Sequence, residues 1–241
     1  MTLRTRVQQR SPILGLGALF ATRWGLALFF GPLVYATYWA MKPWAAGLFG
    51  LSARTAYPFL VLLGPALIFL GAMFFAHKRL FPDIRFVGFC NRKNVAYGVL
   101  AVTVAYLATY LSTYLMGQPR EPIMVNLYQS RTGIELAVFV ASLMVLPPIV
   151  EELAFRHFIL STLPFNANVW TAWLAVVATA LFFVCAHRYI YLTTNLLIFA
   201  VGVIFGLARV RSGGLLLPIG LHAYAIALGL ACDRAAAYLE T

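Results

Sequence analysis

The sequence PPIVEELAFR, residues 147–156, places two adjacent glutamates inside an apolar segment. Residues 136–150 carry no charge, and the chain becomes apolar again soon after Arg156. A charged side chain at the centre of a membrane helix costs about 2.5–3.5 kcal/mol on insertion scales, so an acid placed there indicates a functional site. We therefore expect Glu151 and Glu152 to mark such a site within a membrane-spanning helix.

Helical geometry predicts different roles for the two glutamates. Glu152 and Arg156 are four residues apart and share a helix face, so the arginine can neutralise that carboxylate. Glu151 lies about 100° around the helix and cannot use the same partner as easily. The spacing therefore predicts a structural Glu152–Arg156 pair and leaves Glu151 available for chemistry.

The composition is that of an integral, multi-pass membrane protein. Hydrophobic residues make up 62% of the 241-residue chain and charged residues 10%, whereas soluble domains carry about 25% charged residues. The net charge of +11 would suggest nucleic-acid binding in a soluble protein. Here the basic residues lie in loops beside apolar spans, as membrane topology requires. We expect the lipid bilayer, and no nucleic acid, as the environment, in a bacterial inner or cell membrane.

Seven apolar runs approach the ~20 residues that cross a bilayer, which predicts one all-α, polytopic transmembrane helix bundle over residues 1–241. Residues 1–23 form a basic N-terminal segment; its apolar part, 12–22, is expected at the membrane interface and would make an eighth span if it crosses. Pro147 and Pro148 should kink the fourth span just before the acids, and that helix should continue to about Leu160. The seven runs are 24–41, 56–76, 95–116, 136–150, 169–186, 189–208 and 212–232.

The distribution of basic residues predicts the orientation. With seven spans and the N-terminus inside, twelve of the 18 lysines and arginines fall on the inner side. Because positive loops stay in the cytoplasm, we expect a cytoplasmic N-terminus.

The chain contains four histidines. His77 stands beside Lys78 and Arg79, which favours a solvated residue at the end of a span. His157 follows Arg156 and is interpreted as a helix-face neighbour of the acids. His187 closes the fifth span and His222 lies inside the seventh, where both a packing role and a catalytic role stay open.

A hairpin turning near residues 163–168 would bring His187 toward Glu151. The two would stand roughly 28 and 18 Å from that turn, at 1.5 Å per residue. Helix tilt or a later helix start must close the difference, so the geometry permits a shared site without requiring it.

Three motifs together resemble the CPBP family of intramembrane proteases. They are EExxxR at Glu151–Arg156, FxxxH at Phe183–His187, and a His-Ala pair at His222 in a late apolar helix. The family includes the CAAX prenyl endopeptidases and the bacterial immunity or bacteriocin-processing proteases. The resemblance covers about the last hundred residues and predicts catalytic helices over 134–232, while residues 1–130 contribute only spans.

The resemblance implies an endopeptidase that cuts a peptide bond near a terminus of a membrane-associated or exported protein. Glu151 would be the base that deprotonates water, His187 would position that water, and His222 would face the oxyanion. Glu152 and Arg156 would hold the helix and its charge balance. The expected partner is a protein or peptide substrate with a membrane-associated tail or leader, and no cofactor is expected.

One position departs from the family pattern, in which the third motif usually reads HxxxN. Here the last residue of that motif is Ile226, whose side chain can neither donate nor accept a hydrogen bond. Asn195 in the sixth span or Tyr224 in the seventh are the candidate replacement donors for the oxyanion.

Other interpretations stay open. One carboxylate and two histidines also make a three-ligand zinc set, although the chain has no HExxH motif and we favour a metal-free mechanism. Ile226 is an argument for a non-catalytic membrane scaffold of the same fold. Intramembrane acids and histidines also occur in proton-coupled transporters, but no inverted repeat is present and the acids cluster at one point.

The predicted orientation also bears on the substrate. It would open the site toward the outer half of the membrane. That favours the tail or leader of an exported protein over a prenylated cytosolic one.

Overall fold

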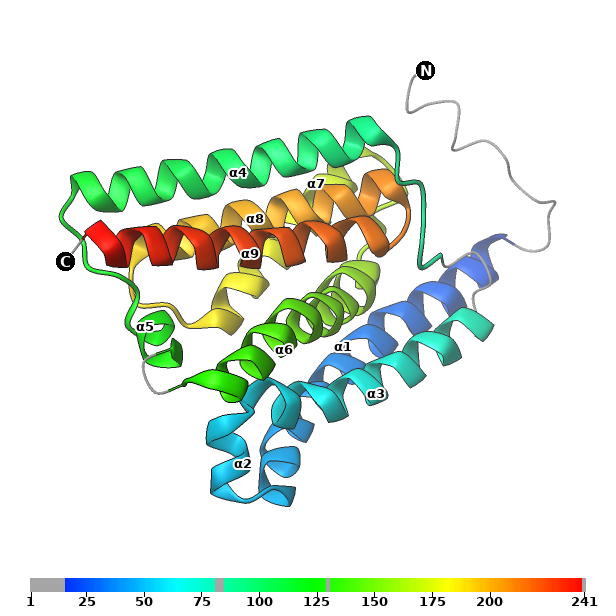
Figure 1. Ribbon diagram of the computed structural model, residues 1–241. Coiled ribbons are helices and arrows are strands. Elements are labelled where there is room, and N and C mark those ends of the chain that lie inside the picture. Colours follow the sequence, from blue (N-terminus) through cyan, green and yellow to red (C-terminus); the bar gives the residue numbers. More distant parts are fainter. Residues whose placement is uncertain (1–15, 81–84, 129–130, 240–241) are drawn as a thin grey trace.

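A computed structural model describes residues 16–80, 85–128 and 131–239, all of them helix, turn or loop with no β-strand (Figure 1). Six of the described helices are long and apolar enough to cross a membrane, which confirms the predicted all-α, multi-pass bundle. The elements are α1 (Leu16–Leu48), α2 (Leu51–Ala56), α3 (Pro58–Leu80), α4 (Arg92–Leu115), α5 (Pro122–Tyr128), α6 (Gly133–Glu151), the π-helix η2 (Glu152–Ile159), the 3₁₀-helix η3 (Leu160–Thr162), α7 (Val169–His187), α8 (Leu192–Ser212) and α9 (Leu216–Leu239).

Helix α1 differs from the prediction at both ends. It runs for 33 residues without a break, so one helix joins the described part of the expected interfacial segment, 12–22, to the expected span, 24–41. A single arginine at position 23 does not interrupt backbone hydrogen bonding, and arginine is a good helix former. At 33 residues α1 is long enough to span, but it is not among the six helices of the described residues that are both long and apolar enough, one fewer than the seven predicted. Residues 1–15 lie outside the described residues.

The acids lie at a change of helix type. The fourth predicted span extends past them, as expected, through η2 and η3 to Thr162. Pro147 and Pro148 lie inside α6, and the α-helix continues through them to Glu151. The change comes at Glu152, directly after the first acid, where the hydrogen bonding becomes π-helical. Single π-helical turns often occur at functional sites.

The bundle has two groups of helices with α6 between them (Figure 1). Helices α4, α8 and α9 pack on one side, and α1, α3 and η2 on the other; α6 contacts both α3 and α9. The chain turns between η3 and α7 through residues 163–168, where the Asn168 side chain caps the first turn of α7, and α7 packs mainly against α8. The junction of α6 and η2 therefore holds the two glutamates where the two groups of helices meet.

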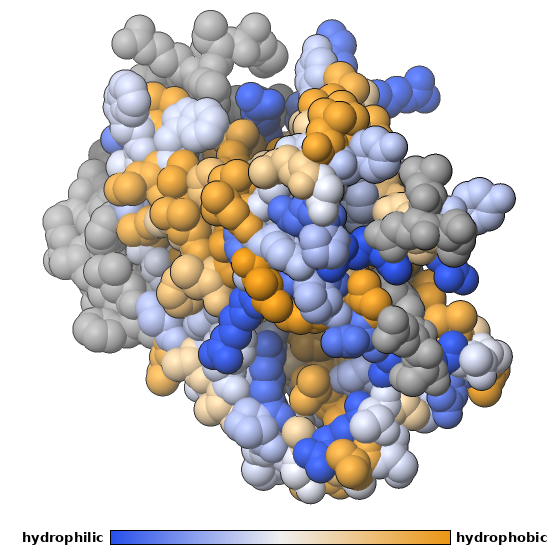
Figure 2. Space-filling view, turned by 90° about the vertical axis from the view of Figure 1, so that its left-hand side faces the viewer, coloured by the Kyte–Doolittle hydropathy of each residue, from blue (hydrophilic) through white to orange (hydrophobic). Residues whose placement is uncertain are grey.

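The surface suits a membrane. Helix α4 exposes large apolar side chains along its length, among them Val104, Leu107 and Leu111, as expected of a helix that faces lipid. Figure 2 views the end of the bundle where α4 and α9 finish, and hydrophilic residues are interspersed with hydrophobic ones there. This end therefore resembles a water-facing surface.

Docking of α1 against the π-helix should depend on Gly31. A Cβ at Gly31 would lie 2.5 Å from the backbone oxygen of Phe158. A main-chain atom cannot easily move away to relieve this steric clash. Gly31→Ala should therefore lower the free energy of unfolding by about 1–3 kcal/mol, measured by thermal unfolding. Gly47→Ala, on the same helix with no atom within 4 Å, is the control and should be neutral or slightly stabilising. Equal stability of the two variants would contradict this docking.

Candidate active site

A fully buried ion pair lies at the start of the π-helix. The Glu152 Oε1 and Arg156 Nη1 atoms are 3.3 Å apart, and both side chains have no exposed surface. Arg156 Nη2 also donates to the backbone oxygen of Gly202 at 3.3 Å, and its guanidinium lies 4.3 Å from the centre of the Phe183 ring. The structure thus forms the pair that helical spacing predicts.

His222 contacts both glutamates. Its Nδ1 atom lies 2.9 Å from Glu152 Oε1, and because a carboxylate accepts, the imidazole donates. Its Nε2 atom is 3.8 Å from Glu151 Oε2. The ring stacks on Phe205 with centroids 5.0 Å apart. Glu152 therefore orients His222 as well as neutralising Arg156, a contact that the sequence analysis did not anticipate.

His187 approaches Glu151 from the end of α7. Its Nδ1 donates to the backbone oxygen of Phe183 at 2.8 Å, since a carbonyl can only accept. In the neutral ring Nε2 is then left as an acceptor, and it lies 3.7 Å from Glu151 Oε2. The two residues meet although their expected heights differ, because α6 is tilted relative to α8 and α9 (Figure 1).

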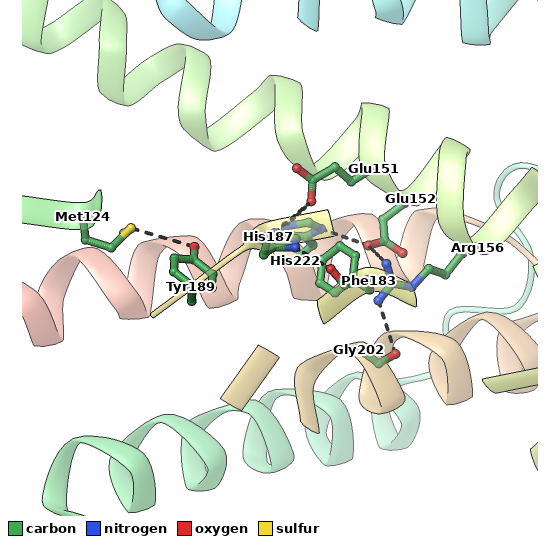
Figure 3. A network of polar contacts seen from close by, with 9 residues as sticks. All are labelled: Met124, Glu151, Glu152, Arg156, Phe183, His187, Tyr189, Gly202 and His222. Atoms are coloured by element: carbon green, nitrogen blue, oxygen red, sulfur yellow. Dashed lines mark hydrogen bonds and ion pairs between the residues drawn. The ribbon is translucent and has the colours of Figure 1, made fainter. Parts of the chain in front are cut away.

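One oxygen of Glu151 is the point on which the site converges (Figure 3). Glu151 Oε2 is buried and has no hydrogen-bond partner, while the side chain as a whole is 19% exposed. The Nε2 atoms of His187 and His222 both face it, at distances too long for direct hydrogen bonds. A carboxylate oxygen and two imidazole nitrogens around one small space can exchange protons with a small molecule bound between them.

Comparison with known proteins identifies the family. The model of the family described as Type II CAAX prenyl endopeptidase Rce1-like matches residues 133–228. A protein of Escherichia coli named "Uncharacterized 24.3 kDa protein" is 34% identical over 168 residues, which cover 69% of this chain and 77% of that protein. The chain belongs to the Rce1-like family. No solved structure matches.

The Rce1-like family is a family of membrane proteases, which confirms the resemblance inferred from the three motifs. The matched region includes the acid pair and both histidines, and it begins at the first residue of α6. Helices α1 to α5 of this Rce1-like protein lie outside it.

The structure gives other partners to both replacement oxyanion donors that the sequence suggested. The two hydrogens of the Asn195 amide go to the backbone oxygens of Tyr189 and Tyr191, at 3.0 and 2.8 Å. The Tyr224 hydroxyl lies 2.7 Å from Thr103 Oγ1 on α4. Residues two apart on a helix do not share a face, so Tyr224 points away from the site that His222 enters. Both side chains therefore already have hydrogen-bond partners away from Glu151.

His77 is not the solvated residue that its neighbours Lys78 and Arg79 suggest. Only 7% of it is exposed, and its Nδ1 lies 3.0 Å from Nε2 of His157. His157 is fully buried and pairs with His77 on α3, so its ring contacts α3 and no contact joins it to the acids. A helix end beside charged residues is usually exposed; here packing against Phe30 and Phe158 overrides that tendency.

Glu121 supports the loop after His187 and was missed by the sequence analysis. Its two carboxylate oxygens accept from the backbone N–H groups of Ile190 and Tyr191, at 3.0 and 3.4 Å. The α8 helix has no side-chain cap of its own at Tyr191, so Glu121 takes that role from a distant segment. The sequence does carry one indication of a role for Glu121: it is one of only seven acidic residues and stands between two spans.

Glu151, His187 and His222 are also residue types that can bind a metal ion. Among the described residues, no group of three or more His, Cys, Asp or Glu side chains has the arrangement that holds a metal ion.

Glu121→Ala should loosen the loop that follows His187. Losing hydrogen bonds to a charged acceptor costs about 1.5–3 kcal/mol, and cleavage should slow because His187 is the residue before this loop. Thermal unfolding and a cleavage assay measure the two effects, and Glu121→Gln should restore part of both because its amide oxygen still accepts. Glu135→Ala, an exposed acid in the first turn of α6, is the charge-matched control; if it has the same effect as Glu121→Ala, this role for Glu121 is wrong.

Proposed function

We propose that this protein is an intramembrane endopeptidase in which Glu151 activates a water molecule. The observation that carries the proposal is the convergence of the two histidine Nε2 atoms on the unpartnered Oε2 atom of Glu151. Membership of a protease family supports the reaction type.

In this mechanism Glu151 takes a proton from water as the water oxygen attacks the carbonyl carbon of the scissile bond. His187 can accept the second hydrogen of that water at Nε2, because its Nδ1 hydrogen is held by the Phe183 carbonyl. In its doubly protonated form, His222 donates from Nε2 to the developing oxyanion. Glu151 then passes its proton to the amide nitrogen as the carbon–nitrogen bond breaks.

The mechanism assigns no metal to the site. It uses Glu152 and Arg156 to hold the charge balance and the orientation of His222. These roles involve no direct contact with the substrate.

The proposed substrate is a protein or peptide with a membrane-associated tail or leader. His187 ends α7, and the loop that follows it is contacted by Glu121 at the end of the bundle opposite the start of α1 (Figure 1). With a cytoplasmic N-terminus, that loop faces the outer side of the membrane. The proposal therefore favours exported proteins over cytosolic prenylated tails.

Glu151→Gln is expected to trap the substrate. The amide cannot accept a proton from water, so turnover should fall by about 10²–10⁴-fold, and uncleaved membrane-associated proteins should accumulate in cells that express the variant. Quantitative proteomics of the membrane fraction identifies them, with Glu135→Gln as a control that should behave like the wild type. Wild-type cleavage of a substrate found in this way should survive a strong chelator. Normal turnover by Glu151→Gln on that substrate would refute the proposed base.

Ile226→Asn separates a compensated protease from an impaired one. His222 and Ile226 lie one turn apart on α9, so an asparagine there could add a second oxyanion donor. Losing one such donor typically costs about 10²–10³ in rate. Because Glu152 already orients His222, we expect less than a tenfold change in cleavage. A gain of about 10²-fold or more, from a nearly inactive wild type, would favour the non-catalytic scaffold instead.

A further inference from the structure

Arg209, in the last turn of α8, is a buried cation without a partner. Only 5% of the residue is exposed. No hydrogen bond or ion pair joins its guanidinium to any group in the described chain, and its Nε atom is fully buried. Its neighbour in the fold is the Phe165 ring, 5.8 Å from the guanidinium carbon. An arginine in this setting points to an anion that the described residues do not supply.

Arg156 differs from Arg209 in having partners for its charge. Arg156 is equally deep, but it has the Glu152 carboxylate and the Gly202 carbonyl. A buried charge without compensation is strongly destabilising. Arg209 stands about 10 Å further along α8 than Gly202, at 1.5 Å per residue, so it cannot share those partners.

A second buried nitrogen atom without a hydrogen-bond partner belongs to His157. His157 is close enough to interact electrostatically with Arg209, and its Nδ1 atom also lacks a hydrogen-bond partner. Its other ring nitrogen is engaged by His77. Two elements far apart in sequence, η2 and the end of α8, therefore each carry a buried nitrogen atom that lacks a hydrogen-bond partner among the described residues.

The surrounding end of the bundle is basic. It is the end where α3 and α8 finish and where α1, α4 and α9 begin (Figure 1), and backbone hydrogen bonds from Phe89 to Ser212 and from Leu215 to Phe86 hold the α3–α4 connection against it. The described residues at this end include no carboxylate. Its basic side chains, besides Arg209, are Lys78, Arg79, Arg85, Arg92, Lys93 and Arg211.

We propose that Arg209, assisted by His157, binds a phosphate group at this end of the bundle. The planar guanidinium matches phosphate oxygens with two parallel hydrogen bonds, and neutral imidazole can donate a third. The same chemistry is offered by the headgroup of an anionic phospholipid and by inorganic phosphate. This site is separate from the glutamates and histidines around Glu151, and it does not depend on the proposed proteolysis.

Thermal unfolding of the purified full chain in nanodiscs tests the proposal. Three conditions are compared: phosphatidylcholine alone, phosphatidylcholine with phosphatidylglycerol, and phosphatidylcholine with inorganic phosphate. A ligand that binds only the folded state raises the unfolding midpoint, here by about 2–4 °C or more. A rise with phosphatidylglycerol alone identifies the lipid headgroup as the source, and a rise with phosphate identifies the free anion.

Arg209→Gln should lose this rise, whereas Arg211→Gln should keep it. Arg211 is exposed two residues away, so it matches the charge change without touching the site. If Arg209→Gln does not fold, Arg209→Lys and native mass spectrometry give the second measurement: the wild type should retain one more phosphatidylglycerol per chain than the lysine variant. No midpoint rise in the wild type, or equal rises in wild type and Arg209→Gln, or equal lipid retention in wild type and Arg209→Lys, would overturn the proposal.

Discussion

The buried pair between Glu152 and Arg156 is the interaction on which the rest of the site depends. Taking two charges out of water is expensive and is tolerated only with good geometry and further hydrogen bonds. Both are present: the carboxylate also receives His222 from α9, and the guanidinium also reaches the Gly202 carbonyl on α8 and lies over the Phe183 ring of α7. The groups that satisfy this one ion pair therefore come from three helices, α7, α8 and α9, which meet at the start of η2.

The same pair accounts for the state of Glu151. Arg156 is engaged by Glu152, so the adjacent carboxylate is left facing two histidine nitrogens that do not bond to it directly. The transition from α-helix to π-helix falls between the two residues. In the proposed mechanism this division of partners makes one glutamate structural and the other a base, although they are neighbours in sequence.

Local spacing predicted much of this arrangement. The Glu152–Arg156 pair follows from the four-residue helical repeat, and the apolar runs gave the bundle. The contacts that were missed are all between distant segments: Glu152 with His222, His77 with His157, and Glu121 with the backbone after His187. The hydrogen-bonding capacity of their side chains suggested Asn195 and Tyr224 as oxyanion donors. Residue type alone does not show which neighbouring segment a side chain on a helix contacts. The helix continues through Pro147 and Pro148, and the hydrogen bonding changes only at Glu152.

The most direct test of this account compares the thermal unfolding of Glu151→Gln and Glu152→Gln under the same conditions. Glu151→Gln should unfold at the wild-type temperature or above it, because no hydrogen bond or arginine partner is lost. Glu152→Gln should unfold well below it, since Arg156 keeps a buried charge without its carboxylate, a loss of about 3–5 kcal/mol. Equal destabilisation by the two changes, or a larger effect at Glu151, would contradict the division of roles between the two glutamates.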